Sequence, residues 1–177
     1  DNQVLVKSAG CGICEGDVLR YVTRRTAPQA GTEVIRLGHE GSGVVVEVGG
    51  QVREFMTGDR VTALGGSYAE YFLAQPSQLA LIPPGVATHR ALGEPIACSL
   101  AAARRFGVCL GDRVAIIGAG YMGLSCLQLL KLQGAAEIVA LDLLDWRLES
   151  ARTFGADSVV NTRDTSPGDL AARLGEF

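Results

Sequence analysis

Hydrophobic residues follow different patterns in the two halves of this 177-residue chain. In the first half they form short runs separated by glycines, prolines and charged residues, a pattern typical of β-strands. Strands are expected at residues 4–7, 44–49, 60–63 and 67–73, with no long helix before residue 92. The first half is therefore predicted to be a small β-rich domain.

The second half alternates strand-like and helical segments. Residues 97–105 have a helical, alanine-rich pattern, and apolar runs at 114–117, 138–141 and 158–161 predict buried parallel strands. Such alternation is typical of an α/β fold with a doubly wound parallel sheet. We place the domain boundary after residue 93, which gives domains 1–93 and 94–177.

Two helices are predicted between these strands. The first has a helical apolar period over residues 122–133 and stops at Gly134. The second starts with Asp145 as its cap and stops at Gly155. One face of this second helix is expected to carry Leu148, Ala151 and Phe154.

A glycine-rich motif follows the strand at 114–117 directly. It has the spacing G-x-G-x-x-G and consists of Gly118, Ala119, Gly120, Tyr121, Met122 and Gly123. The first glycine permits a tight turn, the second lets a pyrophosphate approach the backbone, and the third lets helix and strand pack closely. The N-terminus of the following helix offers free N–H groups and a positive dipole end to phosphates.

Asp142 ends the next strand, 19 positions after the last glycine of the motif. A carboxylate there can accept hydrogen bonds from both ribose hydroxyls of NAD, and it would repel the extra phosphate of NADP. Strand, glycine turn, helix and acidic residue agree, so we predict an NAD site rather than a purely structural turn.

Composition limits the other classes of function. The net charge of −3 gives no reason to expect a nucleic-acid partner or an anionic membrane surface, and the basic cluster Arg20, Arg24 and Arg25 is read as a solvated loop. No run is long enough to span a membrane, and no signal peptide opens the chain. Five irregularly spaced cysteines fit a reducing compartment, so we expect a cytoplasmic protein.

A cysteine pair and a histidine are the candidate metal-binding groups. Cys11 and Cys14 form C-x-x-C, which is compatible with a redox pair, with half of a zinc ribbon, or with a single ligand whose partners lie elsewhere. No second C-x-x-C is present to complete a ribbon. His39 lies between glycines beside Glu40, and spacing alone leaves ligand and structural roles open.

Several motifs in the right order resemble the zinc-dependent medium-chain alcohol dehydrogenases, nearest the polyol and threonine dehydrogenase branch. They are CGIC-x-x-D, GHE-x-x-G-x-V, GDRV, SYAEYF, EPIAC, GAGYMG with Asp142, and WRLESARTFGAD. The resemblance implies a GroES-like catalytic domain followed by the first half of a Rossmann domain, with one catalytic zinc ion. The chain starts without Met and ends just after a third strand, so we expect a fragment truncated at both ends.

The resemblance also implies the roles of individual residues. Cys14 and His39 correspond to zinc ligands, and Cys11 does not. Glu94 occupies the position of a third ligand, while Glu40 coordinates zinc itself in some relatives. Asp17 corresponds to a residue that orients the ligands.

Zinc in such a site acts as a Lewis acid that lowers the pKa of an alcohol, and hydride passes to the nicotinamide of NAD. Arg147 corresponds to a residue near the adenosine ribose. Two departures from the family remove its usual proton relay. Gly16 occupies a position where the family usually has Ser or Thr, and Leu19 occupies one where it often has His. The lobe that holds a structural zinc ion in the family is also absent.

The leading prediction is an NAD-dependent, zinc-dependent oxidoreductase of a secondary alcohol or polyol, homo-oligomeric when full length. The alternatives are a zinc-free reductase of enones or quinones on the same scaffold, and a non-catalytic NAD-binding paralogue. We expect the 177-residue chain alone to self-associate, because its first Rossmann strand would be an unpaired edge. We also expect it to be inactive, because the nicotinamide half of the site would be missing.

Overall fold

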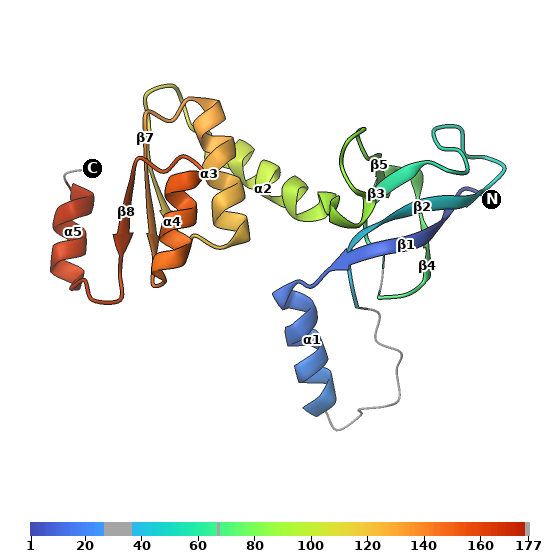
Figure 1. Cartoon of the computed structure of the whole chain (residues 1–177), viewed down its shortest axis with the longest axis horizontal. Coiled ribbons are helices and arrows are strands. Elements are labelled where there is room, and N and C mark those ends of the chain that lie inside the picture. The colour runs from blue at the N-terminus through green and yellow to red at the C-terminus, as the bar shows by residue number, and fades with distance from the viewer. Residues whose placement is uncertain (27–36, 67, 176–177) are drawn as a thin grey trace. The chain divides into compact units, whose positions relative to one another are not determined.

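The computed structural model describes residues 1–26, 37–66 and 68–175. The chain divides into two compact units, Asp1–Pro95 and Ile96–Phe177, and each unit has its own sheet (Figure 1). None of the helices in these described ranges combines the length and the apolar character that crossing a membrane requires.

The first unit contains an antiparallel five-stranded sheet. Its strands are β1 (Val4–Gly12), β2 (Glu40–Val48), β3 (Arg60–Leu64), β4 (Tyr71–Ala74) and β5 (Leu79–Leu81), in the order β4-β1-β2-β3-β5. Two short 3₁₀ helices, η1 (Pro76–Gln78) and η2 (Thr88–Arg90), follow β4 and β5. The core packs alternate strand residues, among them Val4, Val6, Val45, Val61 and Phe72. The predicted β-rich first half is thus confirmed.

The prediction that the first half lacks a long helix is wrong. Helix α1 (Glu15–Thr26) follows β1, and the carbonyl of Cys14 accepts hydrogen bonds from the N–H groups of Asp17 and Val18. Gly16 and several β-branched residues give this segment a low helix propensity, so the sequence pattern does not predict a helix there. Glu15 and Asp17 lie in its first turn, where the helix dipole favours acidic side chains.

Three strand boundaries also differ from the prediction, and the strand expected at 44–49 already begins at Glu40. β1 continues from residue 7 to Gly12, because its whole length pairs with β2. The strand expected at 67–73 begins only at Tyr71, where pairing with β1 starts, and Ser67 lies outside the described residues.

The second unit contains the predicted parallel sheet. Its strands are β6 (Arg113–Ile117), β7 (Glu137–Asp142) and β8 (Ser158–Asn161), in the order β6-β7-β8. The helices are α2 (Gly93–Phe106), which begins in the first unit, α3 (Tyr121–Gln133), α4 (Asp145–Thr153) and α5 (Pro167–Gly175). This arrangement confirms the α/β class.

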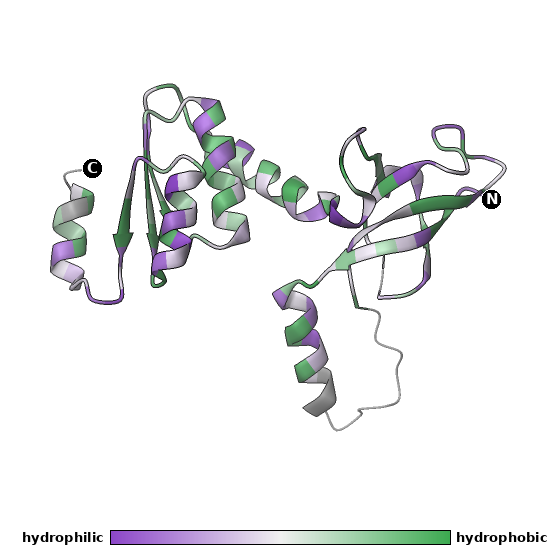
Figure 2. Ribbon diagram, viewed as in Figure 1, coloured by the Kyte–Doolittle hydropathy of each residue, from purple (hydrophilic) through white to green (hydrophobic). Residues whose placement is uncertain are grey.

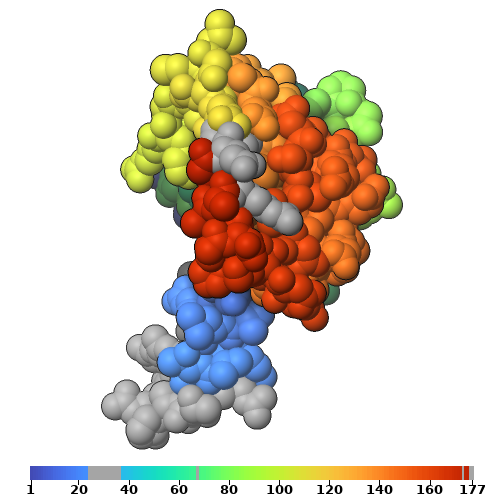
Figure 3. Space-filling view, turned by 90° about the vertical axis from the view of Figure 1, so that its left-hand side faces the viewer, coloured from blue at the N-terminus to red at the C-terminus, as the bar shows by residue number. Residues whose placement is uncertain are grey.

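Helices cover β7 on both faces. Ile138 and Ala140 pack in one cluster with residues of α3 and α4, while Val139 and Leu141 pack in another against α5. Figure 1 shows α5 on one side of the strands and α3 and α4 on the other, and Figure 2 shows β7 as an almost continuous hydrophobic run. Figure 3 shows α5, in red, on the outer surface of this unit.

Three details of the second unit correct the prediction. The strand at 114–117 is not buried on both faces, since β6 is an edge of the described sheet and Ile117 is 85% exposed. Asp145 does not cap α4: Leu144 is the N-cap residue, and Asp145 accepts a hydrogen bond from Asn161. Phe154 is also largely exposed, unlike Leu148 and Ala151 on the same helix.

The predicted helix stops at Gly134 and Gly155 are confirmed. Both glycines have positive φ, at 108° and 105°, a conformation that ends a helix and that side chains disfavour.

Replacement of Leu127 by alanine should destabilise the second unit. Leu127 is fully buried in the core beneath α3, so Leu127→Ala should lower the free energy of unfolding by about 2–5 kcal/mol in urea denaturation. Leu132, on the same helix, is 85% exposed, and Leu132→Ala should change it by less than about 0.5 kcal/mol. Equal losses in the two variants would contradict this core assignment.

Candidate metal centre and dinucleotide site

Cys14, His39 and Glu40 form the one candidate metal-ligand group found among the described residues. One ligand atom of each lies within 4.8 Å of the others. The pairing of β1 with β2 produces this group, because Gly12 at the end of β1 lies opposite Glu40 at the start of β2. Sulfur, nitrogen and oxygen donors so arranged are the ligand types that zinc accepts.

Gly12 leaves room for the Glu40 carboxylate. A Cβ atom at position 12 would overlap Glu40 Oε2, and it would also contact other atoms of that side chain. Glycine at this position therefore lets the carboxylate lie across the end of β1, beside Cys14 and His39.

Asp17 contacts His39 from the first turn of α1. Both of its carboxylate oxygens lie 3.3 Å from His39 Nδ1, and Oδ1 also accepts a hydrogen bond from the Gly38 N–H at 3.1 Å. Burial raises the Asp17 pKa, but the hydrogen bonds from Gly38 and Tyr68 and the nearby His39 outweigh it, so the pKa lies below its ordinary value. An ionised Asp17 therefore orients the imidazole ring.

Cys11 and Glu94 lie outside the ligand group, although the resemblance implies this only for Cys11. The Cys11 thiol faces its neighbour, the Gly12 carbonyl, at 3.5 Å, and burial raises its pKa. Glu94 lies in the first turn of α2. The Glu40 pKa is raised first by burial and next by the charge of Glu94.

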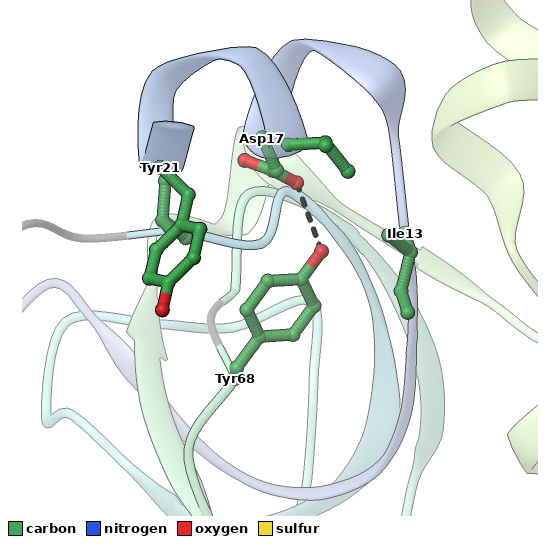
Figure 4. Close-up of a pocket in the computed structure, with 6 residues that line it drawn as sticks. Ile13, Asp17, Tyr21 and Tyr68 are labelled. Atoms are coloured by element: carbon green, nitrogen blue, oxygen red, sulfur yellow. Dashed lines mark hydrogen bonds between the residues drawn. The ribbon is translucent and has the colours of Figure 1, made fainter. Parts of the chain in front are cut away.

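Tyr68 is a site residue that sequence reasoning missed. Its hydroxyl donates to Asp17 Oδ2 at 3.1 Å and also lies 3.2 Å from the Gly12 carbonyl oxygen (Figure 4). Burial and the hydrogen bond to Asp17 raise the Tyr68 pKa to about 12. The residue lies within the SYAEYF motif, but 51 positions separate it from Asp17, and no local pattern links the two.

A mainly apolar cavity of about 370 Å³ lies beside Asp17 (Figure 4). Its lining residues come from the segment just before α1, from α1 itself and from two other segments: Ile13, Asp17, Val18, Tyr21, Leu37 and Tyr68.

The glycine turn in the second unit has the geometry that its motif predicts. Gly118 has a φ of 94°, and a Cβ at Gly123 would overlap the Gly118 carbonyl oxygen, so neither position accommodates a side chain easily. Nothing lies within 4 Å of a Cβ built on Gly120, the N-cap of α3. The backbone at Gly120 is therefore open to an approaching group, and Tyr121 and Met122 begin the helix behind it.

Asp142 binds the glycine turn directly. Its Oδ2 accepts from the Ala119 N–H at 2.8 Å, and its Oδ1 accepts from the N–H groups of Leu143 and Leu144 at 2.7 and 3.0 Å. Burial raises the Asp142 pKa, but these bonds and the Arg147 charge lower it below its ordinary value. The sequence predicted the position of this carboxylate but not its bond to the turn.

Arg147 extends from α4 toward this carboxylate. Its guanidinium lies 3.7 Å from Asp142 Oδ2 and 5.2 Å from the ring centroid of Trp146. Asp142, Arg147 and the glycine turn thus form one contiguous surface.

Comparison with known proteins identifies relatives along the whole chain. Residues 1–84 match the family model of the alcohol dehydrogenase GroES-like domain. Sorbitol dehydrogenase from Bos taurus is 33% identical over 204 aligned positions, which cover 98% of this chain and 57% of the relative. The chain thus spans under two thirds of that relative's length. At least 27 of those 204 positions have no counterpart among the 177 residues here.

Solved structures give the same result. An oxidoreductase of unknown specificity from Escherichia coli matches with a TM-score of 0.89 and 31% identity, covering 99% of this chain and 59% of that one. The 2R,3R-butanediol dehydrogenase from Bacillus subtilis matches with a TM-score of 0.80 and 29% identity, covering 98% and 60%.

Replacement of Asp142 by asparagine should remove a pH-dependent part of the stability of the second unit. Hydrogen bonds to an ionised group contribute about 1.5–3 kcal/mol, so Asp142→Asn should lower the free energy of unfolding by that order near pH 7. Because the folded pKa is lowered, this stabilisation is complete above the unfolded pKa of about 3.9 and is lost as the pH falls through the folded value.

Urea denaturation between pH 7 and pH 3 measures the effect. The difference between wild type and Asp142→Asn should shrink toward the acidic end. The exposed Asp164 provides the control, since Asp164→Asn should differ little from wild type throughout. If the difference in free energy of unfolding between wild type and Asp142→Asn stays constant with pH, the assignment is contradicted.

Proposed function

We propose that this chain belongs to the zinc-dependent medium-chain alcohol dehydrogenase family, and that it carries the zinc site and the adenosine half of the NAD site of a dehydrogenase. The reaction is hydride transfer between a secondary alcohol or polyol and NAD. The two parts of the site belong to a catalytic domain, residues 1–93, and an NAD-binding domain, residues 94–177. The observation that carries the proposal is the grouping of Cys14, His39 and Glu40.

The ligand group fits a catalytic zinc ion. Three protein ligands leave one coordination position open, and a thiolate with one carboxylate balances the charge of the metal. Zinc held there would supply Lewis-acid chemistry that lowers the pKa of an alcohol. Glu94 is the alternative third ligand, because the resemblance aligns it with that position.

Asp17 and Tyr68 prepare the His39 ring for this role. Asp17 accepts the Nδ1 proton of His39, which leaves Nε2 as the nitrogen with a free electron pair. Tyr68 in turn donates to Asp17 and holds that carboxylate in place. The imidazole is therefore fixed in one tautomer and one orientation.

The second unit supplies the cofactor site. The open backbone at Gly120 and the N-terminus of α3 accept a pyrophosphate, and Asp142 with Arg147 lies where the adenosine ribose binds. NAD provides the acceptor for the hydride. The acidic Asp142 favours NAD over NADP.

Polyol substrates are proposed from the relatives, since sorbitol dehydrogenase from Bos taurus and D-xylulose reductase from Saccharomyces cerevisiae both match almost the whole chain. We further propose a cytoplasmic enzyme that forms homo-oligomers. A zinc-free reductase on the same scaffold has no use for a converged thiol, imidazole and carboxylate, so this grouping favours the zinc enzyme.

Zinc content tests the ligand assignment. Purified protein should hold about one zinc ion per chain by atomic emission, and Cys14→Ser should lose it because the thiolate is a ligand. Cys11→Ser is the matched control, since Cys11 lies outside the ligand group, and it should keep the metal. Loss of zinc from Cys11→Ser but not from Cys14→Ser would refute the assignment.

Calorimetric titration tests the cofactor assignment. A hydrogen bond to a charged acceptor contributes about 1.5–3 kcal/mol, so Asp142→Ala should weaken NAD binding by about 10- to 100-fold. It should also reduce the preference for NAD over NADP. Asp145→Ala, three residues further on, should bind NAD as wild type does. Equal wild-type affinity for NAD and NADP would overturn the role given to Asp142.

A further inference from the structure

Thr62 connects the backbone beside Glu40 with the backbone beside Glu94. Its hydroxyl donates to the Gly41 carbonyl at 3.2 Å and accepts from the Gly93 N–H at 2.7 Å. Gly41 follows Glu40 in β2, and Gly93 precedes Glu94 in α2. A single hydroxyl therefore joins the two chain segments that carry the two candidate third ligands.

The hydroxyl also satisfies the start of α2. The first N–H groups of a helix have no partner within the helix and need one from outside. Gly93 begins α2, and Thr62 from the neighbouring strand β3 supplies that partner. The position of the first turn, which contains Glu94, thus depends on a side chain of the sheet.

Gly93 shows how close this approach is. A Cβ atom at position 93 would lie 2.6 Å from Thr62 Cγ2 and 2.9 Å from Thr62 Oγ1. Both distances are shorter than real Cβ contacts, so only glycine permits the helix to begin against Thr62.

We propose that Thr62 is a positioning residue that fixes the start of α2 and so holds Glu94, as the alternative ligand, within reach of the Cys14, His39 and Glu40 group. This inference rests on the proposed function, since it concerns the same metal site. Thr62 fixes the separation of the two glutamates through the backbone on either side.

Titration with Co²⁺ tests the proposal without relying on activity. The visible ligand-field bands and the thiolate charge-transfer band of Co²⁺ report affinity and coordination geometry. Thr62→Val removes both hydrogen bonds and should weaken Co²⁺ binding by about tenfold and change the ligand-field bands, as loss of a residue that orients metal ligands does. Thr62→Ser keeps the hydroxyl and should bind as wild type does.

A double-mutant cycle with Glu94→Gln identifies the route of the effect. If Thr62 acts through Glu94, then Thr62→Val should weaken binding little further in the Glu94→Gln background. Thr165 also donates its hydroxyl to a backbone carbonyl, that of Asn161, but it lies in the second unit. Thr165→Val is therefore the matched control and should leave Co²⁺ binding unchanged.

Distinct outcomes separate the two proposals. Wild-type protein that binds no Co²⁺ refutes the metal site, and with it the role of Thr62. If the wild type binds Co²⁺ and folded Thr62→Val has the same affinity and spectrum, the role of Thr62 alone is refuted. It is also refuted if Thr62→Val still lowers the Co²⁺ affinity tenfold in the Glu94→Gln background. Circular dichroism checks folding, and Thr62→Ala replaces Thr62→Val, with the same expected outcomes, if the valine variant does not fold.

Discussion

The antiparallel pairing of β1 with β2 is the interaction on which the metal-ligand group depends. Two irregularities interrupt the pairing, one between Leu5 and Val6 and one between Ser8 and Gly10, and the second cancels the shift of the first. Without that cancellation Gly12 would face His39, and the Glu40 carboxylate would meet the side chain of Cys11. Bulges of this kind re-aim side chains near functional sites.

The parts of the structure that local geometry determines could be predicted from the sequence. The glycine turn, the helix stops at Gly134 and Gly155, and the strands of the second unit each depend on a few neighbouring residues. The exposure of Ile117 depends instead on strand order, which no hydrophobic pattern contains. Helix α1 was missed because Gly16 and its β-branched residues give it a low intrinsic helix propensity.

The same distinction applies to the candidate site. The family resemblance indicated Cys14, His39 and both glutamates as ligand candidates, because it aligns them by position. Tyr68 and Thr62 act through contacts 51 and 31 residues away along the chain, and hydroxyl groups of this kind carry no signature in sequence. Residues that orient ligands are therefore the part of a site that a structure adds.

The two covered faces of β7 have a consequence for how its pairing is chosen during folding. A strand that is apolar on both faces presents similar surfaces after a slip of one residue, so burial alone discriminates weakly between alignments. The polar groups at its two ends do discriminate. Glu137 forms an ion pair with Arg113, its partner on β6, with Nε and Oε2 2.8 Å apart, and Asp142 binds the N–H of Ala119. A slip would separate both pairs at once, so the charged groups at the two ends of β7 select the alignment of an otherwise apolar strand.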